Sequence, residues 1–275
     1  MNTPSLFAIA GKVIVVTGAT GTLTGSAAKY LAGQGARVVY LGRTQSKLDA
    51  TLTEVRKELP DAEVLAVAAD VNDRAALEHA RDTVVARWGR VDALLNGAGG
   101  NQPGATLTPD KTFTDLDFSA FRQVVDLNLH GTVLPTLVFT PALQASPAAS
   151  IVNYSSASAS RAITRVIGYS AAKAAVENFT RWLAVEFARK SKGTMRVNAL
   201  VPGFFLGEQN RRLLTNEDGT LTARGETIIR QTPFGRFGQA DELHGAIHYL
   251  VSDASKFVTG TTLVVDGGFG VFSGV

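Results

Sequence analysis

The stretch Lys12–Gly25, with the sequence KVIVVTGATGTLTG, decides the fold. The apolar run Val13–Val16 leads into a turn with Gly18, Gly21 and Gly25, and a helical pattern follows. Glycine lets the backbone turn sharply there, and the N–H groups at the start of the helix can face a pyrophosphate. Glycines in such a turn can also serve backbone geometry alone. The position of the turn, after an apolar strand and before a helix, favours dinucleotide binding.

Outward from this stretch, short β-branched runs alternate with longer helical patterns. The predicted strands are Val13–Val16, Val38–Leu41, Val64–Ala68, Ala93–Leu95, Ile151–Tyr154, Val197–Val201 and Leu263–Val265. The predicted helices are Leu23–Gly33, Ser46–Glu58, Arg74–Trp88, Phe118–Leu143, Gly168–Arg189 and Ala240–Leu250. Because the strands are continuous apolar runs, we expect a parallel sheet buried on both faces. The pattern predicts one α/β domain over residues 1–275, a Rossmann-like doubly wound parallel sheet of about seven strands with helices on both faces.

The composition supports a folded domain and argues against several functional classes. Hydrophobic residues make up 45% of the 275 positions and charged residues 19%, which suffices for a buried core. The net charge is +3, but the basic residues are scattered, so a nucleic-acid face is not expected. The absence of cysteine excludes disulfides and thiolate metal sites. His244 and His248 have no further ligand beside them, and we interpret them as a solvent or packing face of a helix rather than a metal site.

The sequence contains no targeting or membrane signal. A basic stretch followed by a long apolar core, as in a secretory signal, does not occur near the N-terminus. No apolar run reaches the ~18 residues of a membrane-spanning helix. We expect a soluble, cytoplasmic protein with a small-molecule substrate and no nucleic-acid or membrane partner.

Two positions after predicted strands bear on the choice of nucleotide. NAD-selective folds usually place an acidic residue at the end of the second strand, where it binds the ribose 2′-hydroxyl. This chain has Gly42 there, followed by Arg43, whose guanidinium can bind a phosphate. We therefore favour NADP(H), with NAD(H) as the alternative, although Arg43 could equally stack on adenine or lie in solvent. After the third strand, Asp70 and Val71 lie where side chains could meet the adenine; a helix N-cap is the other interpretation of Asp70.

Two long polar connections interrupt the alternation of strands and helices. Gly99–Asp117 follows the fourth predicted strand, and Phe204–Gln231 follows the sixth. Long connections in a compact domain are usually functional or mobile, and open α/β sheets bind ligands at the C-terminal ends of their strands. We expect both connections to border a ligand site, with a substrate lid around residues 204–231.

The sequence YSAAK (Tyr169–Lys173) opens a long helical pattern. Tyr169 and Lys173 are four positions apart, so they share one face of the helix. An ammonium beside a phenol favours the phenolate and should lower the pKa of Tyr169 from about 10. A tyrosine with such a pKa suits acid–base catalysis. The same spacing also occurs on many helices without a function, so the interpretation depends on the other motifs.

Together these motifs resemble those of the short-chain dehydrogenase/reductase family over essentially the whole chain. The matching segments are TGATGTLTG (17–25), NGAG (96–99), VVDLNLHGT (124–132), IVNYSS (151–156), YSAAK, Pro202-Gly203 and VVDGG (264–268). The resemblance implies an NAD(P)-dependent oxidoreductase that interconverts a secondary alcohol and a ketone by hydride transfer, without a metal.

The resemblance also implies roles for individual residues. Asn128, Ser156, Tyr169 and Lys173 correspond to the family's catalytic tetrad, with Ser155 as the less favoured alternative to Ser156. Tyr169 would transfer the proton and Ser156 would bind the substrate oxygen, while Lys173 would lower the pKa of Tyr169 and bind the nicotinamide ribose. Asn128 would hold a water molecule, or would instead bond neighbouring backbone. The implied cofactor-binding positions are Gly18, Thr20, Gly21, Thr22, Leu23, Arg43, Asp70, Val71, Asn96, Gly97, Ala98, Tyr169, Lys173, Pro202 and Gly203.

The chain departs from the family pattern at two places. The family turn reads TGxxxGxG, but Thr22 and Thr24 stand where its last two glycines would fall. Side chains at these positions would obstruct a close approach of the backbone to the cofactor. The family also commonly has a threonine four residues after Pro202-Gly203, in contact with the nicotinamide carboxamide. Here that position is Gly207, so this contact would be missing and the start of the lid would be looser.

A narrower resemblance is to a bacterial subgroup of D-mannonate oxidoreductases (fructuronate reductases), which interconvert D-mannonate and D-fructuronate. It rests on segments such as NGAGGNQPGAT, DLNLHGTVLPTLVF and TRVIGYSAAKAAVENFTRWLAVE. A hexonate needs a cation for its carboxylate and polar groups for its hydroxyls. The substrate-binding candidates are Ser156, Arg165, Asn101, Gln102 and Gln209, with Arg161, Arg211, Arg212 and Asn210 as further candidates. Each arginine could instead be a solvated loop charge.

Two other functions fit the same motifs. A carbonyl reductase of this fold acting on 3-ketoacyl groups or simple diols would carry the same tetrad. A non-catalytic nucleotide-sensing protein would keep the fold but would typically lose Tyr169, Lys173 or Ser156, and all three are present. From the family resemblance and the apolar helical patterns Phe118–Leu143 and Gly168–Arg189, we also expect a homotetramer or a dimer.

Overall fold

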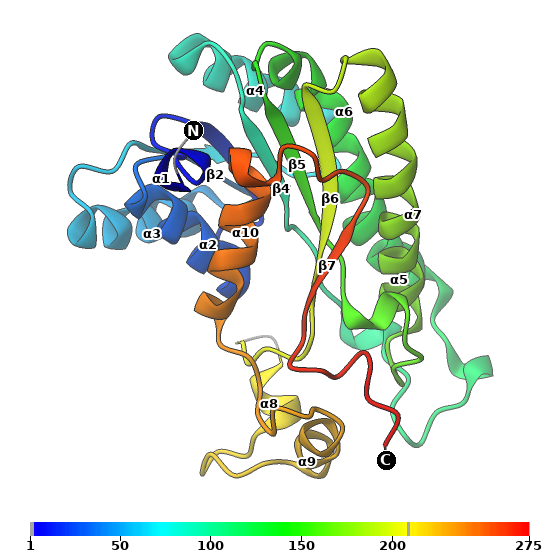
Figure 1. Cartoon of the computed structure of the whole chain (residues 1–275). Helices are drawn as coiled ribbons and strands as arrows, with labels where there is room; N and C mark the ends of the chain where they lie inside the picture. The colour runs from blue at the N-terminus through cyan, green and yellow to red at the C-terminus, as the bar shows by residue number, and fades with distance from the viewer. Residues whose placement is uncertain (1–2, 208–209, 275) are drawn as a thin grey trace.

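A computed structural model of the chain describes residues 3–207 and 210–274. Its seven strands form one sheet in the order β3-β2-β1-β4-β5-β6-β7 (Figure 1), and every neighbouring pair is parallel. The strands are β1 (Val13–Thr17), β2 (Arg37–Gly42), β3 (Val64–Ala68), β4 (Ala93–Asn96), β5 (Ala149–Tyr154), β6 (Met195–Pro202) and β7 (Thr262–Val265). Each predicted strand lies within an observed one, and the predicted Rossmann-like α/β fold is confirmed.

Side chains along the inner strands alternate between two hydrophobic cores. On β1, Val13 and Val15 face one core, and Ile14 and Val16 face the other. All four are fully buried, because helices cover both faces of the sheet. Successive side chains on a strand point to opposite faces, so a strand buried on both faces must be apolar at every position. This requirement explains the continuous apolar runs in the sequence.

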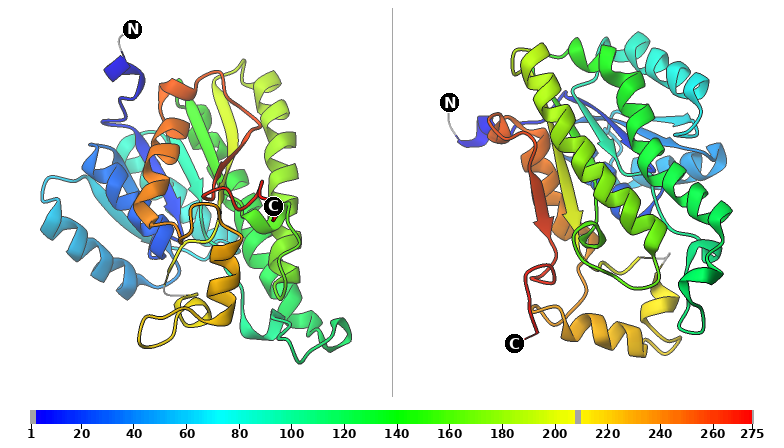
Figure 2. Two further views of the ribbon diagram at one scale, coloured as in Figure 1. Left: turned by 60° about the horizontal axis from the view of Figure 1, so that its bottom comes forward. Right: turned by 90° about the vertical axis from the view of Figure 1, so that its right-hand side faces the viewer.

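The helices form one layer on each face of the sheet (Figure 2). One layer contains α2 (Thr22–Gly33), α3 (Gln45–Glu58) and α10 (His244–Val251), and the other contains α4 (Arg74–Trp88), α6 (Gly131–Gln144) and α7 (Ile167–Lys190). A short helix, α1 (Thr3–Leu6), precedes the sheet. Among the helices of the described ranges, none is long and apolar enough to cross a membrane.

His244 and His248 lie on a packing face of α10, as one of the two interpretations of the sequence predicts. The Nε2 atom of His244 lies 2.9 Å from Ser26 Oγ, and Nδ1 of His248 lies 2.9 Å from the Tyr30 hydroxyl. Both histidines therefore join α10 to α2. Residues 3–207 and 210–274 contain no group of three or more side chains placed to hold a metal ion.

The helix predicted over Phe118–Leu143 is not continuous. It divides into α5 (Phe118–Val125), a π-helical turn η3 (Asp126–His130) and α6. A single π turn inserted into an α-helix frequently marks a functional site. The helix predicted over Ala240–Leu250 likewise divides into the 3-10 turn η5 (Ala240–Leu243) and α10. The other 3-10 turns are η1 (Pro103–Ala105), η2 (Phe113–Asp115), η4 (Ala157–Ala159) and η6 (Asp253–Ser255).

The chain between β6 and η5 leaves the sheet at the C-terminal ends of the strands. It contains α8 (Arg211–Leu214) and α9 (Ala223–Arg230), which lie below the sheet in Figure 1. The two ends of this segment meet, since Gly238 N donates a hydrogen bond to Phe204 O at 2.9 Å. The region predicted as a lid is thus an excursion from the sheet whose first and last residues are hydrogen-bonded to each other.

Candidate active site

The chain reverses its order in the sheet between β1 and β4, and a crevice at such a point is the usual ligand site of an open α/β sheet. Thr17 joins the two strand ends, because its Oγ1 accepts hydrogen bonds from Gly97 N (3.0 Å) and Ala98 N (3.1 Å). Gly18 follows with a φ of 67°, and a Cβ atom there would lie 2.8 Å from Ala98 Cα. Only glycine fits this left-handed, closely packed position.

The N-terminus of α2 is suited to bind the phosphates of a dinucleotide. Its N-cap is Gly21, which has no side chain to cap the helix, and the first turn contains no acidic residue. The backbone N–H groups of this turn, which includes Thr22 and Leu23, and the positive end of the helix dipole therefore remain available to an anion. The residues present fit the pyrophosphate of a nicotinamide dinucleotide.

Ser156 and Tyr169 meet at the C-terminal end of β5. Ser156 forms the N-cap of η4, and its Oγ accepts a hydrogen bond from Ser158 N at 3.2 Å. Its hydroxyl is also hydrogen-bonded to that of Tyr169, in the first turn of α7. Ser155, the less favoured alternative to Ser156 in the tetrad, is buried and donates to Glu177 Oε1 at 2.9 Å. The geometry therefore favours Ser156 over Ser155 as the serine beside Tyr169.

Lys173 lies beneath Tyr169 and is buried. Its Nζ is 5.5 Å from the centre of the Tyr169 ring and donates a hydrogen bond to Tyr154 O at 2.7 Å. Burial lowers the pKa of Lys173 to about 8. An ammonium with this pKa loses its charge within the range of ordinary enzyme assays.

The expectation that the pKa of Tyr169 is lowered is wrong for this structure. Burial of the hydroxyl raises the pKa of Tyr169, and the hydrogen bond to Ser156 lowers it only in part. The cost of placing a phenolate in a buried site is the larger effect, and the ammonium is directed to the Tyr154 carbonyl instead. Tyr169 is consequently a phenol at neutral pH, which is the form that donates a proton.

Asn128 bonds neighbouring backbone, the second of the two alternatives for this residue. Its Nδ2 donates to Gly100 O (2.7 Å) and Val124 O (2.8 Å), and its Oδ1 accepts from Gly100 N (3.1 Å). A Cβ atom at Gly99 would lie 2.6 Å from Asn128 Oδ1 and 3.3 Å from Lys173 Nζ. Asn128 thus fixes the loop after β4 next to Lys173, and it acts as a positioning residue.

Comparison with known proteins identifies this arrangement. A family model described as enoyl-(acyl carrier protein) reductase matches residues 18–270. The chain belongs to the short-chain dehydrogenase/reductase family. It is therefore an NAD(P)-dependent oxidoreductase.

Three relatives illustrate the similarity within this family. The chain is 43% identical over 276 residues to the uncharacterized oxidoreductase UxuB of Bacillus subtilis, covering 97% of this chain and 98% of that protein. It is 31% identical over 271 residues to gluconate 5-dehydrogenase of Gluconobacter oxydans, covering 98% and 99%. A crystal structure of a candidate D-mannonate oxidoreductase from Haemophilus influenzae with bound NAD has a TM-score of 0.89 and 37% identity, covering 98% of this chain and 99% of that one.

Each of the two threonines that depart from the family turn packs against a glycine on another segment. Thr24 points inward, is buried, and donates to Gly18 O at 2.5 Å. A Cβ atom at Gly97 would lie only 2.1 Å from Thr24 Cγ2, so Thr24 uses space that a side chain at position 97 would need. Thr22 is paired in the same way with Gly207, whose Cβ would lie 3.2 Å from Thr22 Oγ1. The expectation that Thr24 obstructs the turn is wrong, because its side chain faces Gly97.

This pairing makes a prediction about Gly97. Gly97→Ala is expected to lower the melting temperature by several degrees and to weaken cofactor binding, because overpacking costs about 1–3 kcal/mol. Thr24→Ser removes the clashing methyl group and keeps the hydroxyl bonded to Gly18, so it should restore stability in the double variant. Thermal unfolding and NADPH fluorescence titration of the two single variants and the double variant measure the coupling. Equal losses with and without Thr24→Ser would contradict the pairing.

The structure places the candidate nucleotide-selecting residues at the ends of β2 and β3. Arg43 is exposed immediately after β2. Asp70 follows β3, and its Oδ1 accepts a hydrogen bond from Asn72 N at 2.8 Å in a local turn. The alternative interpretation of Asp70 as a helix N-cap is wrong, because Asp73 caps α4 by accepting from Ala76 N.

The other implied cofactor positions lie at the same edge of the sheet. Asn96 ends β4 and donates to Thr136 and Asn153, while its buried Oδ1 has no partner among the described residues. Val71 is buried, and Thr20 is exposed in the turn before α2. Pro202 ends β6, and the next residue, Gly203, leaves no room for a side chain, since a Cβ atom there would lie 2.6 Å from Asp266 Cβ.

Several substrate candidates already have hydrogen-bond partners within the chain. Asn101 donates to Thr106 Oγ1 at 2.8 Å, and Gln102 donates to Ala120 O at 2.9 Å. The Arg161 guanidinium donates to the backbone oxygen of Phe272, near the C-terminus. Asn210 closes a turn at the start of the lid, Arg211 and Arg212 are exposed on α8, and Gln209 lies outside the described residues.

Arg165 has an unusual backbone. It precedes α7 with a φ of 80°, a conformation that costs a non-glycine residue about 1–3 kcal/mol. Its carbonyl accepts a hydrogen bond from Leu107 N at 3.0 Å, which joins the segment after Ser156 to the loop after β4. Strain of this kind often accompanies a functional position, so Arg165 stays the foremost candidate for the substrate carboxylate.

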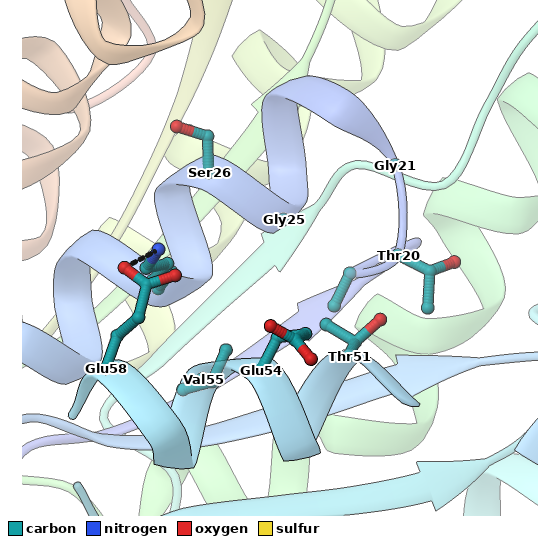
Figure 3. Close-up of a pocket in the computed structure, with 10 residues that line it drawn as sticks. Thr20, Gly21, Gly25, Ser26, Thr51, Glu54, Val55 and Glu58 are labelled. Atoms are coloured by element: carbon teal, nitrogen blue, oxygen red, sulfur yellow. Dashed lines mark hydrogen bonds and ion pairs between the residues drawn. The ribbon is translucent and has the colours of Figure 1, made fainter. Parts of the chain in front are cut away.

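A hollow of about 320 Å³ between α2 and α3 is separate from these residues (Figure 3). Thr20 and Gly21 lie at one end, and Lys29 pairs with Glu58 at 2.5 Å along its wall. None of the four tetrad residues lines it. Ser156 and Tyr169 lie outside this hollow, at the C-terminal end of β5 and the start of α7.

The sequence interpretation missed two groups that hold the site together. Thr17 fixes the loop after β4 through its hydroxyl, and the Tyr154 carbonyl fixes Lys173. Thr17 directly precedes the glycine turn, and this position could have indicated its role in the sequence. The backbone carbonyl of Tyr154 has no signal in the sequence.

Proposed function

We propose that this oxidoreductase acts on a sugar acid and interconverts D-mannonate and D-fructuronate. The proposal depends above all on the similarity, over nearly the whole chain, to the Haemophilus influenzae protein described as a candidate D-mannonate oxidoreductase. Arg165, next to the segment that carries Ser156 and Tyr169, supplies the cation that a sugar acid needs. The similarity to gluconate 5-dehydrogenase supports the same class of substrate.

The chemistry is divided between the cofactor and two side chains. A bound nicotinamide accepts or supplies a hydride at its C4 atom. In reduction of the ketone, the Tyr169 phenol donates the proton that becomes the hydroxyl proton of the product. The Ser156 hydroxyl donates a hydrogen bond to the substrate oxygen as negative charge develops on it. In oxidation Tyr169 must begin as the phenolate, which takes up the hydroxyl proton of the substrate as the hydride leaves the carbon atom.

The proposal is tested by assaying the purified protein with NADH and NADPH against a panel of ketouronates, 3-ketoacyl thioesters and simple diketones. We expect turnover of D-fructuronate, and of D-mannonate in the reverse direction, at higher kcat/KM than the other compounds. Turnover of 3-ketoacyl groups or diols alone would favour the carbonyl-reductase alternative. Binding of NADPH without turnover of any carbonyl, unchanged by Tyr169→Phe, would favour a nucleotide sensor.

For the cofactor we propose a preference for NADP(H). Arg43 is exposed after β2, and Gly42 stands where a carboxylate would repel the 2′-phosphate. Arg43→Ala is expected to lower kcat/KM for NADPH by about 10- to 100-fold, since a hydrogen bond to a charged group contributes about 1.5–3 kcal/mol. The value for NADH should change little. The structure of the Haemophilus influenzae protein contains bound NAD. A wild-type protein that turns over NADH with a higher kcat/KM than NADPH would contradict the proposed preference.

We also propose that the protein is a homotetramer. Phe118 on α5 is 66% exposed and Trp182 on α7 is 63% exposed, although both are large apolar side chains. Such residues on neighbouring helices favour an interface between copies of the chain. Sedimentation velocity at micromolar concentration should show a tetramer, and Trp182→Glu should shift it to a smaller species. A wild-type monomer would contradict the proposal.

A further inference from the structure

One contact joins the α8–α9 unit to the segment between the two catalytic side chains. Arg224 lies in the first turn of α9, and its Nη1 and Nη2 atoms are 3.3 Å and 3.5 Å from Thr164 Oγ1 and Thr164 O. Thr164 directly precedes Arg165. The segment that holds both residues begins at Ser156 and ends in the helix of Tyr169.

Arg165 and Arg224 therefore bring two positive charges to the segment between Ser156 and Tyr169. Neither forms an ion pair with an acidic side chain in residues 3–207 and 210–274. Partial burial lowers the pKa of Arg224, and the positive charge of Arg165 lowers it further. Two partly buried guanidinium groups that no acidic side chain of the described ranges neutralises repel each other, and an anion bound between them would replace this repulsion with attraction.

We propose that Arg224 and Arg165 form a two-arginine site for the carboxylate of the substrate, with Arg224 supplied by the α8–α9 unit. This inference rests on the proposed sugar-acid function and adds a residue that the sequence interpretation did not identify. Guanidinium groups bind carboxylates through paired hydrogen bonds, so two of them fix the orientation of the substrate as well as its position. The phosphates of the cofactor have a separate site at the N-terminus of α2.

The proposed site joins the unit between β6 and η5 to the segment that carries the catalytic candidates. Its ends are joined between Phe204 and Gly238, and α9 contacts the Ser156–Tyr169 segment through Arg224 and Thr164. A carboxylate held by Arg165 from the segment and by Arg224 from α9 connects the two. Substrates with a carboxylate would therefore be bound by both arginines, and neutral ones would not.

The test uses the full-length protein with NAD(P)+ and D-mannonate. Arg224→Gln is expected to raise the KM for D-mannonate by about 10- to 100-fold, with a smaller change in kcat and no change in the Kd for NADPH. Arg224→Lys should retain part of the affinity, because it keeps the charge but not the paired hydrogen bonds. Arg230→Gln is the matched control, since it removes the same charge from the exposed end of α9. Arg165→Gln and Arg224→Gln should be non-additive in the double variant.

The outcomes separate this inference from the proposed function. Turnover of D-mannonate with a KM that neither Arg224→Gln nor Arg165→Gln changes would overturn the two-arginine site and leave the function intact. If D-mannonate is not turned over, the function fails, and calorimetric binding of D-mannonate to the NADPH-loaded protein decides the inference. Binding that Arg224→Gln abolishes and Arg230→Gln preserves would then support the site. Absence of binding to the wild type would overturn it.

Discussion

Replacing Tyr169 with phenylalanine is expected to lower kcat for ketone reduction roughly 1,000-fold. The variant loses the hydroxyl that donates the proton, and general acid catalysis by a placed side chain contributes about 10²- to 10⁴-fold. Substrate KM and the Kd for NADPH should change little, because the ring and its packing remain. Steady-state kinetics with D-fructuronate and fluorescence titration with NADPH measure the two effects separately.

Tyr40→Phe is the matched control for this prediction. Tyr40 is fully buried on β2, and its hydroxyl has no hydrogen-bond partner among the described residues. Removing it should leave kcat unchanged, since the substitution takes away only an unsatisfied buried hydroxyl. A loss of less than about tenfold in Tyr169→Phe, or an equal loss in Tyr40→Phe, would contradict the role of Tyr169 as proton donor.

Much of the fold follows from local patterns in the sequence. The run Val13–Val16 is apolar at every position because β1 is covered on both faces, and this property is visible without a structure. The break at Asp126–His130 is not visible, because it accompanies a side-chain contact between Asn128 and Gly100, on another segment. A helical pattern reports which residues share a face, but it does not report a π turn that a tertiary contact requires.

In the candidate site, too, the sequence predicts the local arrangement but not the features that depend on tertiary contacts. The spacing of Tyr169 and Lys173 places them correctly on one helix face, but the pKa of Tyr169 shifts in the direction opposite to the prediction. The sign depends on how deeply the hydroxyl is buried, which is a property of the whole fold. The pairing of Thr24 with Gly97 and the approach of Arg224 to Thr164 are also tertiary contacts, so no local pattern predicts them.

Lys173 is expected to determine how the reaction depends on pH. Its buried ammonium has a pKa of about 8, so it is charged below that pH and neutral above it. A positive charge near Tyr169 stabilises the phenolate that forms as the proton leaves, so ketone reduction should be fastest when Lys173 is charged. We expect kcat/KM for reduction to be level below about pH 8 and to fall up to tenfold per pH unit above it.

Two variants test whether Lys173 causes this decline. Lys173→Met removes the charge at every pH, so activity at neutral pH should fall about 100-fold and the decline above pH 8 should disappear. Lys173→Arg keeps a charge that ordinary pH does not remove, so its activity, although lower than that of the wild type, should stay level beyond pH 8. A decline near pH 8 that persists unchanged in Lys173→Arg would show that another group titrates there. Lys173 would then only hold the Tyr154 carbonyl and the loop at Gly99 in place.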